Sequence, residues 1–441
     1  MTAARARTSK ARSGVLVGTP DDPAAPEWLD AALVTRTAER VGTPYYLYCA
    51  ERIRDRCTAL RDAFPGAHVR YAMKANSNRA VLATIRTSGL GVDTVSPWEV
   101  RLARSVGFGR EQILYSGSNP STDELHEIHD AGATLNLDSL SALERFATVA
   151  PRARVSLRLN LEIGGGHHPH VVTAGPDSKF GLSRSEIPRA VAIARKFGLR
   201  IVGIHQHVGS GIFQRGLFLR ALDRLLDLAT RFPELEFIDA GGGFGVPYRA
   251  RERAVDLASW GPAVMARFDA ARAKAGRDLS LVLEPGRYLV ADAGVLVTRV
   301  TTVKRTRDRT FVGVDSGMHH LVRPAMYGSH HAIYTLTQTA RRAERCFVVG
   351  PICESGDFLA ADRRMPPPSE GDLLVVGNAG AYGYTMASFY NLRARPPECM
   401  LDAGDVRIVQ PRDTYAGVVG ESEPMTSAFG RPRSRVPRRR W

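Results

Sequence analysis

Lys74 is the residue of this chain best placed for covalent chemistry. The chain contains only six lysines, and Lys74 directly follows the strand-like run 68–73. Burial disfavours the charged form of an amine and lowers its pKa, and a neutral lysine amine can form a Schiff base with a carbonyl group. The residue is therefore a candidate Schiff-base former, although by itself such a short motif more often marks an ordinary surface lysine.

Five further clusters of glycine, histidine and charged residues each begin where an apolar run ends. They are 203–211 (GIHQHVGSG), 239–245 (DAGGGFG), 284–287 (EPGR), 353–357 (CESGD) and 380–383 (GAYG). Each of them could be a simple chain reversal, but their shared position after apolar runs requires a common explanation.

The size and composition of the chain indicate a globular protein with two domains. It has 441 residues, 44% of them hydrophobic, and a single core seldom grows beyond ~300 residues. The net charge of +15 is concentrated at the ends, because ten basic and no acidic residues lie in 1–16 and 431–441. The rest is nearly balanced, so no nucleic-acid or membrane partner is expected, and 1–25 and 423–441 are expected to be disordered basic tails.

The cysteines and histidines give no sign of a metal site or a disulfide framework. The five cysteines form no CxxC pair, which argues against structural zinc and favours a cytoplasmic protein. His167, His168 and His170 could bind a metal, but the glycines 164–166 and Pro169 favour a loop, so no metal is expected. No apolar run approaches the ~18 residues of a membrane span.

Eight short apolar or β-branched segments alternate with longer amphipathic segments between residues 45 and 284. This alternation predicts an α/β protein with βα units around a parallel sheet. Eight units in about 240 residues predict a (β/α)8 barrel over 45–295, because that length is close to the usual size of the fold. The expected strands are 68–73, 90–95, 112–116, 134–137, 154–160, 200–207, 235–240 and 279–284, and the expected helices include 97–107, 122–131, 139–150, 185–197, 213–232 and 253–275.

After residue 295 the pattern changes to alternating strands and turns. It predicts a mainly antiparallel β domain over 296–422. The segment 26–44 is expected to pack against this domain. The expected strands of the β domain are 295–304, 311–315, 345–353, 373–376 and 406–410.

The clusters fall at one place in the predicted barrel, because the active site of this fold lies at the C-terminal ends of the strands. Lys74 follows the first expected strand, Asp93 ends the second, His207 ends the sixth and Glu284 ends the eighth. Side chains some two hundred residues apart in sequence are therefore expected to face one mouth.

These side chains fit pyridoxal 5'-phosphate, which needs an amine for its aldehyde, phosphate ligands, a group over its ring and a charge at its pyridine nitrogen. Lys74 would bind the aldehyde, and His207 would lie against the ring. Glu284 would keep the pyridine nitrogen protonated. An acidic partner at that nitrogen favours strong electron withdrawal, which suits decarboxylation or other carbanion chemistry.

A phosphate site is expected after the seventh and eighth strands. The glycine-rich turn lets backbone amides approach an anion closely, and an arginine adds a charge-assisted hydrogen bond. The candidate cofactor-binding residues are Lys74, Asp93, His207, Ser210, Gly243, Gly245, Glu284, Gly286 and Arg287.

Two motifs in the β domain are ambiguous from their chemistry alone. Cys353 could be a buried structural cysteine, the commoner state, or a thiol placed for proton transfer beside Glu354 and Asp357. Arg323 and Tyr327 could end a strand, or they could grip a carboxylate.

Taken together, the motifs resemble those of the diaminopimelate decarboxylases, within the fold-type III pyridoxal phosphate decarboxylases that include the eukaryotic-type ornithine decarboxylases. The resemblance covers about residues 30–420 and rests on the order and spacing of the clusters above. Further matching motifs are Arg158-Leu159-Asn160, Ser178-Lys179-Phe180-Gly181 and Ala387-Ser388-Phe389-Tyr390-Asn391.

The resemblance implies a homodimer with shared active sites, in which Cys353 and its neighbours reach the site of the partner subunit. It implies that Lys74 binds the cofactor and that Cys353 takes part in protonating the product carbanion, so that Lys74, His207 and Cys353 are the candidate catalytic residues. The implied activity is the conversion of meso-diaminopimelate to L-lysine and carbon dioxide. The implied ligands of the far amino-acid end of the substrate are Arg287, Arg323, Tyr327, Glu354 and Tyr382, with Tyr382 also near the cofactor.

Arginines at 287 and 323 fit a substrate with a distal carboxylate, because ornithine or lysine would leave a buried cation unpaired. Two loops depart from the family pattern, at Gly117–Pro120 and at 161–177. One alternative is therefore a decarboxylase of specialised metabolism that acts on a D-amino acid or a carrier-bound substrate. A second alternative is an inactive regulatory homologue, against which the retention of Lys74, Glu284 and Cys353 argues.

Overall fold

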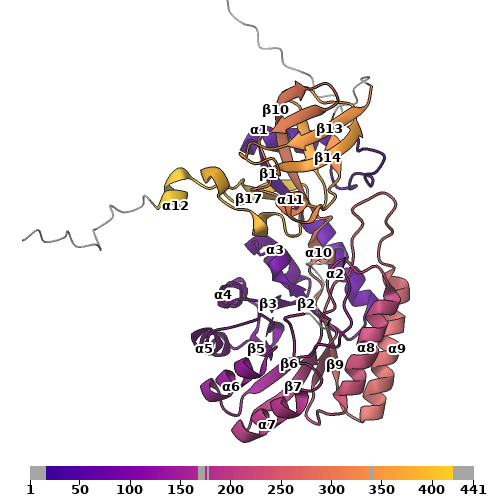
Figure 1. The fold of residues 1–441 in the computed structure, drawn as a ribbon, viewed down its shortest axis with the longest axis vertical. Coiled ribbons are helices and arrows are strands. Elements are labelled where there is room, and N and C mark those ends of the chain that lie inside the picture. The colour runs from indigo at the N-terminus through magenta and orange to yellow at the C-terminus, as the bar shows by residue number, and fades with distance from the viewer. Residues whose placement is uncertain (1–15, 167–173, 176–177, 337–341, 421–441) are drawn as a thin grey trace, which may run out of the picture.

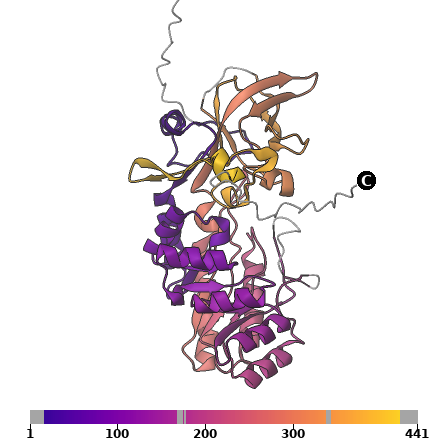
Figure 2. The same ribbon diagram turned by 90° about the vertical axis from the view of Figure 1, so that its left-hand side faces the viewer.

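The computed structural model describes residues 16–166, 174–175, 178–336 and 342–420. Figure 1 shows two lobes, a barrel below and a β-sheet domain above, and Figure 2 shows the same arrangement from the side. His167, His168 and His170, the first 15 residues and the last 21 lie outside the described residues, so most of the expected tails are not described.

The lower lobe is a closed barrel of eight parallel strands. Each strand predicted from the sequence overlaps one of them, so the predicted (β/α)8 barrel is confirmed. The strands are β2 (His68–Ala72), β3 (Gly91–Thr94), β4 (Ile113–Tyr115), β5 (Thr134–Leu137), β6 (Arg154–Arg158), β7 (Arg200–His205), β8 (Phe237–Asp239) and β9 (Ser280–Leu283).

The barrel helices begin and end at recognisable residues. In α4, the Ser96 side chain accepts a hydrogen bond from the Glu99 amide, Pro97 occupies the first turn, and Gly107 ends the helix with φ of 99°. Helices α2 and α3 were not predicted from the sequence. The helices around the barrel are α2 (Ala50–Ala63), α3 (Arg79–Thr87), α4 (Pro97–Val106), α5 (Thr122–Asp130), α6 (Leu140–Val149), α7 (Ile187–Phe197), α8 (Arg215–Ala229) and α9 (Leu257–Ala275). None of the helices in the described parts of the chain is both long and apolar enough to span a membrane.

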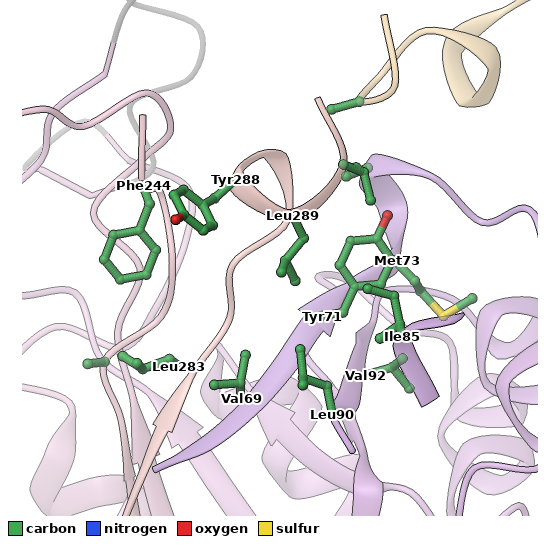
Figure 3. Close-up of a cluster of buried hydrophobic side chains, with 14 of the residues drawn as sticks. Val69, Tyr71, Met73, Ile85, Leu90, Val92, Phe244, Leu283, Tyr288 and Leu289 are labelled. Atoms are coloured by element: carbon green, nitrogen blue, oxygen red, sulfur yellow. The ribbon is translucent and has the colours of Figure 1, made fainter. Parts of the chain in front are cut away.

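Apolar packing supports the turn that carries Lys74. Figure 3 shows Tyr71 of β2 close to Met73 and to Ile85 of α3, all within one buried cluster. Lys74 is the central residue of the short 3-10 turn η1 (Met73–Ala75), and the residues on either side of it, Met73 and Ala75, are both buried. A fully buried side chain of the size of Met73 contributes about 1.5–3 kcal/mol to the free energy of unfolding. The buried neighbours of Lys74 therefore hold its backbone in place.

The upper lobe is a nine-stranded sheet in which most neighbouring strands are antiparallel, with β1–β16 and β11–β13 the parallel pairs. Helix α1 (Ala31–Val41) packs on it, since Val34 and Ala38 share a buried cluster with Leu47 and Val297. The prediction that the N-terminal segment packs on the β domain is confirmed. The strands are β1 (Tyr45–Cys49), β10 (Gly294–Arg305), β11 (Thr310–Val314), β12 (Ile333–Thr335), β13 (Glu344–Val349), β14 (Phe358–Met365), β15 (Leu373–Val376), β16 (Glu398–Asp402) and β17 (Asp405–Gln410).

The barrel lobe begins later than the expected boundary at residue 45. Strand β1 pairs antiparallel with β10 and parallel with β16, and all five of its residues are buried. Because both edges of β1 are hydrogen-bonded inside the sheet, this strand belongs to the β domain. The barrel lobe then starts with α2 at Ala50.

The expectation of a disordered tail over 1–25 is wrong for residues 16–25. Val17 and Thr335 exchange two backbone hydrogen bonds of 3.0 and 2.9 Å. Asp22 is 7% exposed, and its Oδ1 lies 2.7 Å from His330 Nε2 and 3.4 Å from Arg363 Nη1. A buried carboxylate with these partners fixes the segment against the sheet, which the basic composition of the N-terminus did not indicate.

Replacing Asp22 with alanine is expected to lower the free energy of unfolding by about 3–5 kcal/mol, because Arg363 would become a buried unpaired cation. Despite burial, the contacts with His330, Thr19 and Arg363 lower the pKa of Asp22. The contribution of Asp22 to the free energy of unfolding is therefore fully present above the pKa of 3.8 that this group has in the unfolded chain. It is lost as the pH falls through the lower pKa of the folded protein. Urea unfolding at pH 7 measures the loss. The exposed neighbour in Asp21→Ala is the matched control, and equal stabilities of the two variants would contradict the prediction.

Candidate active site

A cavity of about 350 Å³ lies at the C-terminal ends of the barrel strands, facing the β domain. Ten of the predicted site residues line it: Lys74, His207, Ser210, Gly243, Glu284, Gly286, Arg287, Arg323, Tyr327 and Tyr382. Four predicted residues do not line it: Asp93, Gly245, Cys353 and Glu354. The shared mouth expected from the strand order is thus present, and ten of the fourteen predicted residues face it.

Lys74 extends from η1 into the cavity, and Asp93 lies behind it. Lys74 Nζ donates to Asp93 Oδ2 at 2.5 Å, and Ser116 donates a short hydrogen bond to the other oxygen of this fully buried carboxylate. Burial lowers the pKa of Lys74, but Asp93, Tyr382 and Glu284 outweigh it and raise the pKa above its usual value. The expectation of a lowered amine pKa is therefore wrong here, because Asp93 stabilises the ammonium form.

Glu284 follows β9 and forms the floor of the cavity with His205 of β7. Their side chains are 4% and 1% exposed, and His205 Nε2 lies 2.9 Å from Glu284 Oε2. Burial by itself raises the pKa of Glu284, but His205 and Lys74 outweigh burial and hold the pKa well below its usual range. Glu284 Oε1 has no hydrogen-bond partner among the described residues. The site therefore presents an ionised carboxylate oxygen that can accept one further hydrogen bond, as a protonated pyridine nitrogen would donate.

Three possible metal ligands lie together at the C-terminal ends of β7, β8 and β9. Ligand atoms of His205, Asp239 and Glu284 lie within 4.8 Å of one another. His205 and Glu284 are already hydrogen-bonded to each other, which accounts for part of this grouping without a metal.

His207 lies after β7 and keeps a neutral ring. The backbone amide of Gly242 donates to His207 Nδ1 at 3.2 Å, so that nitrogen carries a lone pair. Burial, with the positive charges of Arg158 and Lys74, lowers the pKa of His207 to about 3. A neutral, half-buried ring at this position can lie against a planar cofactor without placing a second cation beside Lys74.

The glycine-rich turn after β8 packs too closely for side chains. Gly243 has φ of 100°, and a Cβ there would lie 2.3 Å from the carbonyl oxygen of Gly209. The Gly245 amide donates to the carbonyl of Ile212 at 2.9 Å, so this amide is already engaged. Gly243 therefore brings bare backbone to the cavity wall, whereas Gly245 shapes the turn.

Two buried arginines begin two short helices at the junction of the lobes, α10 (Arg287–Val290) and α11 (Arg323–Tyr327), both labelled in Figure 1. Arg287 Nε and Nη2 donate to Ser210 Oγ at 3.3 and 3.0 Å. Arg287 and Arg323 are 6% and 2% exposed, and neither forms an ion pair with a carboxylate in the described parts of the chain. Two buried cations without acidic partners are a site for an anion.

Tyr382 reaches the cavity from the β domain. Its amide donates to the carbonyl of Ala75 at 2.8 Å, beside the Lys74 turn, and its ring lies 4.9 Å from the Arg287 guanidinium carbon. Its φ is 57°, the left-handed region that non-glycine residues seldom adopt. The loop around Tyr382 therefore joins the two lobes directly at the site.

Cys353 and Glu354 lie in an exposed turn of the β domain, after β13. The buried carboxylate of Asp357 closes this turn, because it accepts hydrogen bonds from the amides of Met318 at 2.6 Å and Ile352 at 2.7 Å. The alternative of a buried structural cysteine is thus wrong for Cys353, and a thiol held on a fixed, exposed turn is available to another molecule.

Three residues were given no role from the sequence: His205 and Arg158, which line the cavity and occur within quoted motifs, and Tyr248, which lies next to the cavity. His205 precedes His207 by two positions, a spacing that places both on one face of a strand, so strand periodicity could have found it. Arg158 ends β6 and lines the cavity. Tyr248 follows the glycine turn by three residues, and no local pattern marks it.

Residues 50–291 match the family model described as "Pyridoxal-dependent decarboxylase, pyridoxal binding domain". The chain is 41% identical over 400 residues to the diaminopimelate decarboxylase of Methanothermobacter thermautotrophicus, with 88% of this chain and 93% of the relative covered. It is 37% identical over 404 residues to that of Pseudomonas aeruginosa, with 88% and 95% covered.

The solved structures agree with the sequence relatives. The crystal structure of diaminopimelate decarboxylase from Helicobacter pylori complexed with L-lysine superposes with a TM-score of 0.82 at 31% identity, with 88% of this chain and 98% of that chain covered. The fold, the lysine-bearing cavity and these similarities lead to one conclusion. The chain belongs to the diaminopimelate decarboxylase family of the pyridoxal-dependent decarboxylases.

Proposed function

We propose that the protein is a pyridoxal 5'-phosphate-dependent carboxy-lyase that converts meso-diaminopimelate to L-lysine and carbon dioxide. The observation that carries this proposal is the cavity itself, with an amine and a carboxylate at its barrel end and, at its far end, two buried arginines that have no carboxylate partner among the described residues. Relatives named diaminopimelate decarboxylase support it, as do two such structures described as complexes with L-lysine.

The residues present fit the cofactor. Glu284 Oε1, which has no partner among the described residues, would accept from the pyridine nitrogen, and His207 would lie against the ring. Ser210, the backbone at Gly243 and Arg287 would hold the phosphate. Bound there, the cofactor supplies an electron sink for the bond that breaks as carbon dioxide leaves.

Lys74 would bind the cofactor aldehyde through its Nζ. Asp93 keeps this amine oriented and charged in the structure described, so it acts as a positioning residue for Lys74. Asp93 is fully buried, whereas the Lys74 side chain is 38% exposed and lines the cavity. We therefore assign Asp93 to the support of the lysine and not to direct contact with the cofactor.

Substrate choice would depend on the far end of the cavity. Arg287 and Arg323 are buried and have no carboxylate partner in the part of the chain that the structure describes, and Tyr327 lines the cavity beside them. A substrate that retains a carboxylate at its non-reacting end offsets the cost of keeping these cations out of water, whereas a plain diamine adds further positive charge.

Arg323→Ala tests this assignment. It is expected to raise the KM for meso-diaminopimelate by about 10–100-fold, since a charge-assisted hydrogen bond to a buried group is worth about 1.5–3 kcal/mol. D-Lysine, which lacks the distal carboxylate, should be affected much less. Steady-state kinetics on both substrates checks the prediction, and equal changes for the two would remove the argument for a distal carboxylate.

We also propose a homodimer in which each site uses both subunits. Cys353 and Glu354 are exposed, do not line the cavity of their own chain, and lie on a turn fixed by Asp357. Cys353 of one subunit would hold the proton delivered to the product carbanion in the site of the other. All five cysteines are free thiols, which suits a cytoplasmic location.

A second candidate function is decarboxylation of another amino acid with the same machinery. Gly117 and Ser118, from a loop that departs from the family pattern, line the cavity. Carbon dioxide release from the cofactor-loaded enzyme, compared between meso-diaminopimelate, D-lysine, D-ornithine, L-lysine and L-ornithine, separates the two functions. Preference for meso-diaminopimelate supports the first, and turnover of another substrate in its place supports the second.

A further inference from the structure

Tyr248 is the point at which the two buried arginines meet. Arg287 Nη1 and Arg323 Nη1 each donate to the Tyr248 hydroxyl oxygen at 3.0 Å. The Tyr248 ring also lies 5.9 and 5.0 Å from the two guanidinium carbons. A single phenol oxygen thus joins two cations that come from different lobes, α10 of the barrel side and α11 of the β domain.

Tyr248 lies behind the arginines and not in the cofactor cavity. It lines a second cavity of about 230 Å³, and Arg287, Arg323 and Tyr327 line both cavities. The arginine pair therefore forms the partition, with the substrate cavity on one side and Tyr248 on the other. A side chain in that place can set the geometry of the arginines without touching the cofactor.

The backbone and ring of Tyr248 are themselves held in place. Its amide donates to Glu252 Oε2 at 2.7 Å, and its ring packs edge-on against His331 with 5.2 Å between the centroids. His331 is oriented in turn, because its Nδ1 lies 2.8 Å from the carbonyl of Gly377, to which it can only donate. His331 Nε2 therefore carries a lone pair and accepts from Arg323 Nη1 at 2.9 Å.

These contacts leave one edge of Arg323 available. Its Nη1 is engaged by both Tyr248 and His331, and no hydrogen bond joins its Nε or Nη2 to a residue in the described parts of the chain. The Nε–Nη2 edge is the fork that binds a carboxylate through two parallel hydrogen bonds. In Arg287 the same edge is engaged by Ser210, so Arg323 is the arginine left free to bind a carboxylate.

We propose that Tyr248 is a positioning residue that selects substrates with a distal carboxylate, by holding Nη1 of both arginines and turning the fork of Arg323 toward the cavity. The proposal rests on the proposed function and names a determinant of its specificity. Burial raises the pKa of Tyr248, but Arg323 and Arg287 outweigh burial and lower the pKa below its usual value. The two guanidinium groups that donate to this oxygen therefore also stabilise negative charge on it.

The test uses the cofactor-loaded enzyme with Tyr248→Phe, which keeps the ring and removes only the oxygen. L-Lysine, which retains the distal carboxylate, and cadaverine, which lacks it, are titrated by calorimetry. The ratio of their affinities is expected to fall about tenfold, the effect of losing one charge-assisted hydrogen bond. The KM for meso-diaminopimelate is expected to rise by a similar factor, with kcat changed less than about twofold.

Tyr45→Phe is the matched control, because the Tyr45 hydroxyl is buried in the β domain and donates to Val34. It should leave both the affinity ratio and the KM unchanged. A general loss of packing would lower cofactor absorbance and thermal stability in both variants, whereas the proposed role changes selectivity in Tyr248→Phe alone.

The outcomes separate this inference from the proposed function. If the wild-type enzyme binds L-lysine no better than cadaverine, the enzyme has no binding site for the distal carboxylate, and the substrate assignment of the proposed function is wrong. If the wild-type enzyme discriminates and Tyr248→Phe discriminates equally well, the role of Tyr248 is overturned and the proposed function stands. Should the phenylalanine variant not fold, Tyr248→Leu and Tyr248→Gln decide: the acceptor oxygen of glutamine should retain more selectivity, and equal ratios in the two variants overturn the proposal.

Discussion

Replacing Lys74 with alanine is expected to reduce carbon dioxide release to background and to remove the covalent link between protein and cofactor. Among the residues that the structure describes, Lys74 is the only lysine that lines the cavity, so no second lysine amine there can bind the cofactor aldehyde. The wild-type protein is expected to absorb at about 420 nm with pyridoxal phosphate bound, and borohydride should fix the cofactor to the chain. Absorbance and mass spectrometry after reduction check both expectations without reference to activity.

Lys179→Ala is the control for this prediction, since Lys179 is also a lysine of the barrel lobe but does not line the cavity. It should retain the reducible cofactor. Borohydride-fixed cofactor in Lys74→Ala would show that another amine is the attachment point, and the assignment of Lys74 would then fail.

Cys353→Ala is expected to lower kcat by about 10²–10⁴-fold, the usual contribution of a positioned proton donor. Cofactor binding should be unchanged, because Cys353 is exposed and does not line the cavity of its own chain. Cys346→Ala is a suitable control, since Cys346 is buried in the sheet and its thiol contacts the carbonyl of Met365. A Cys353→Ala variant with wild-type kcat would exclude the thiol as the proton donor.

Mixing two inactive variants tests whether the sites are shared. If each site combines Lys74 of one subunit with Cys353 of the other, a mixed dimer of Lys74→Ala and Cys353→Ala subunits contains one site with both residues intact. Random exchange then restores about a quarter of the wild-type activity, since half of the dimers are mixed and each has one working site. If mixing restores no activity although the subunits exchange, each site uses Cys353 of its own chain.

The local sequence determined the barrel and most of the cavity. Strand periodicity located all eight barrel strands, and parallel strands bring their C-terminal ends to one mouth, so Lys74, His207, Glu284 and Arg287 could be placed together without a structure. Motif order further identified Arg323, Tyr327 and Tyr382, which come from the other lobe and for which strand periodicity gives no location.

The tertiary structure alone decided what those residues do to one another. Asp93 reverses the pKa shift expected for Lys74, and Tyr248 joins two arginines that lie 39 and 75 positions further along the chain. It also decided that β1 belongs to the sheet. These outcomes depend on contacts between residues distant in sequence, and the distance and burial of such contacts, which set the strength of a charge interaction, have no signature in local composition or periodicity.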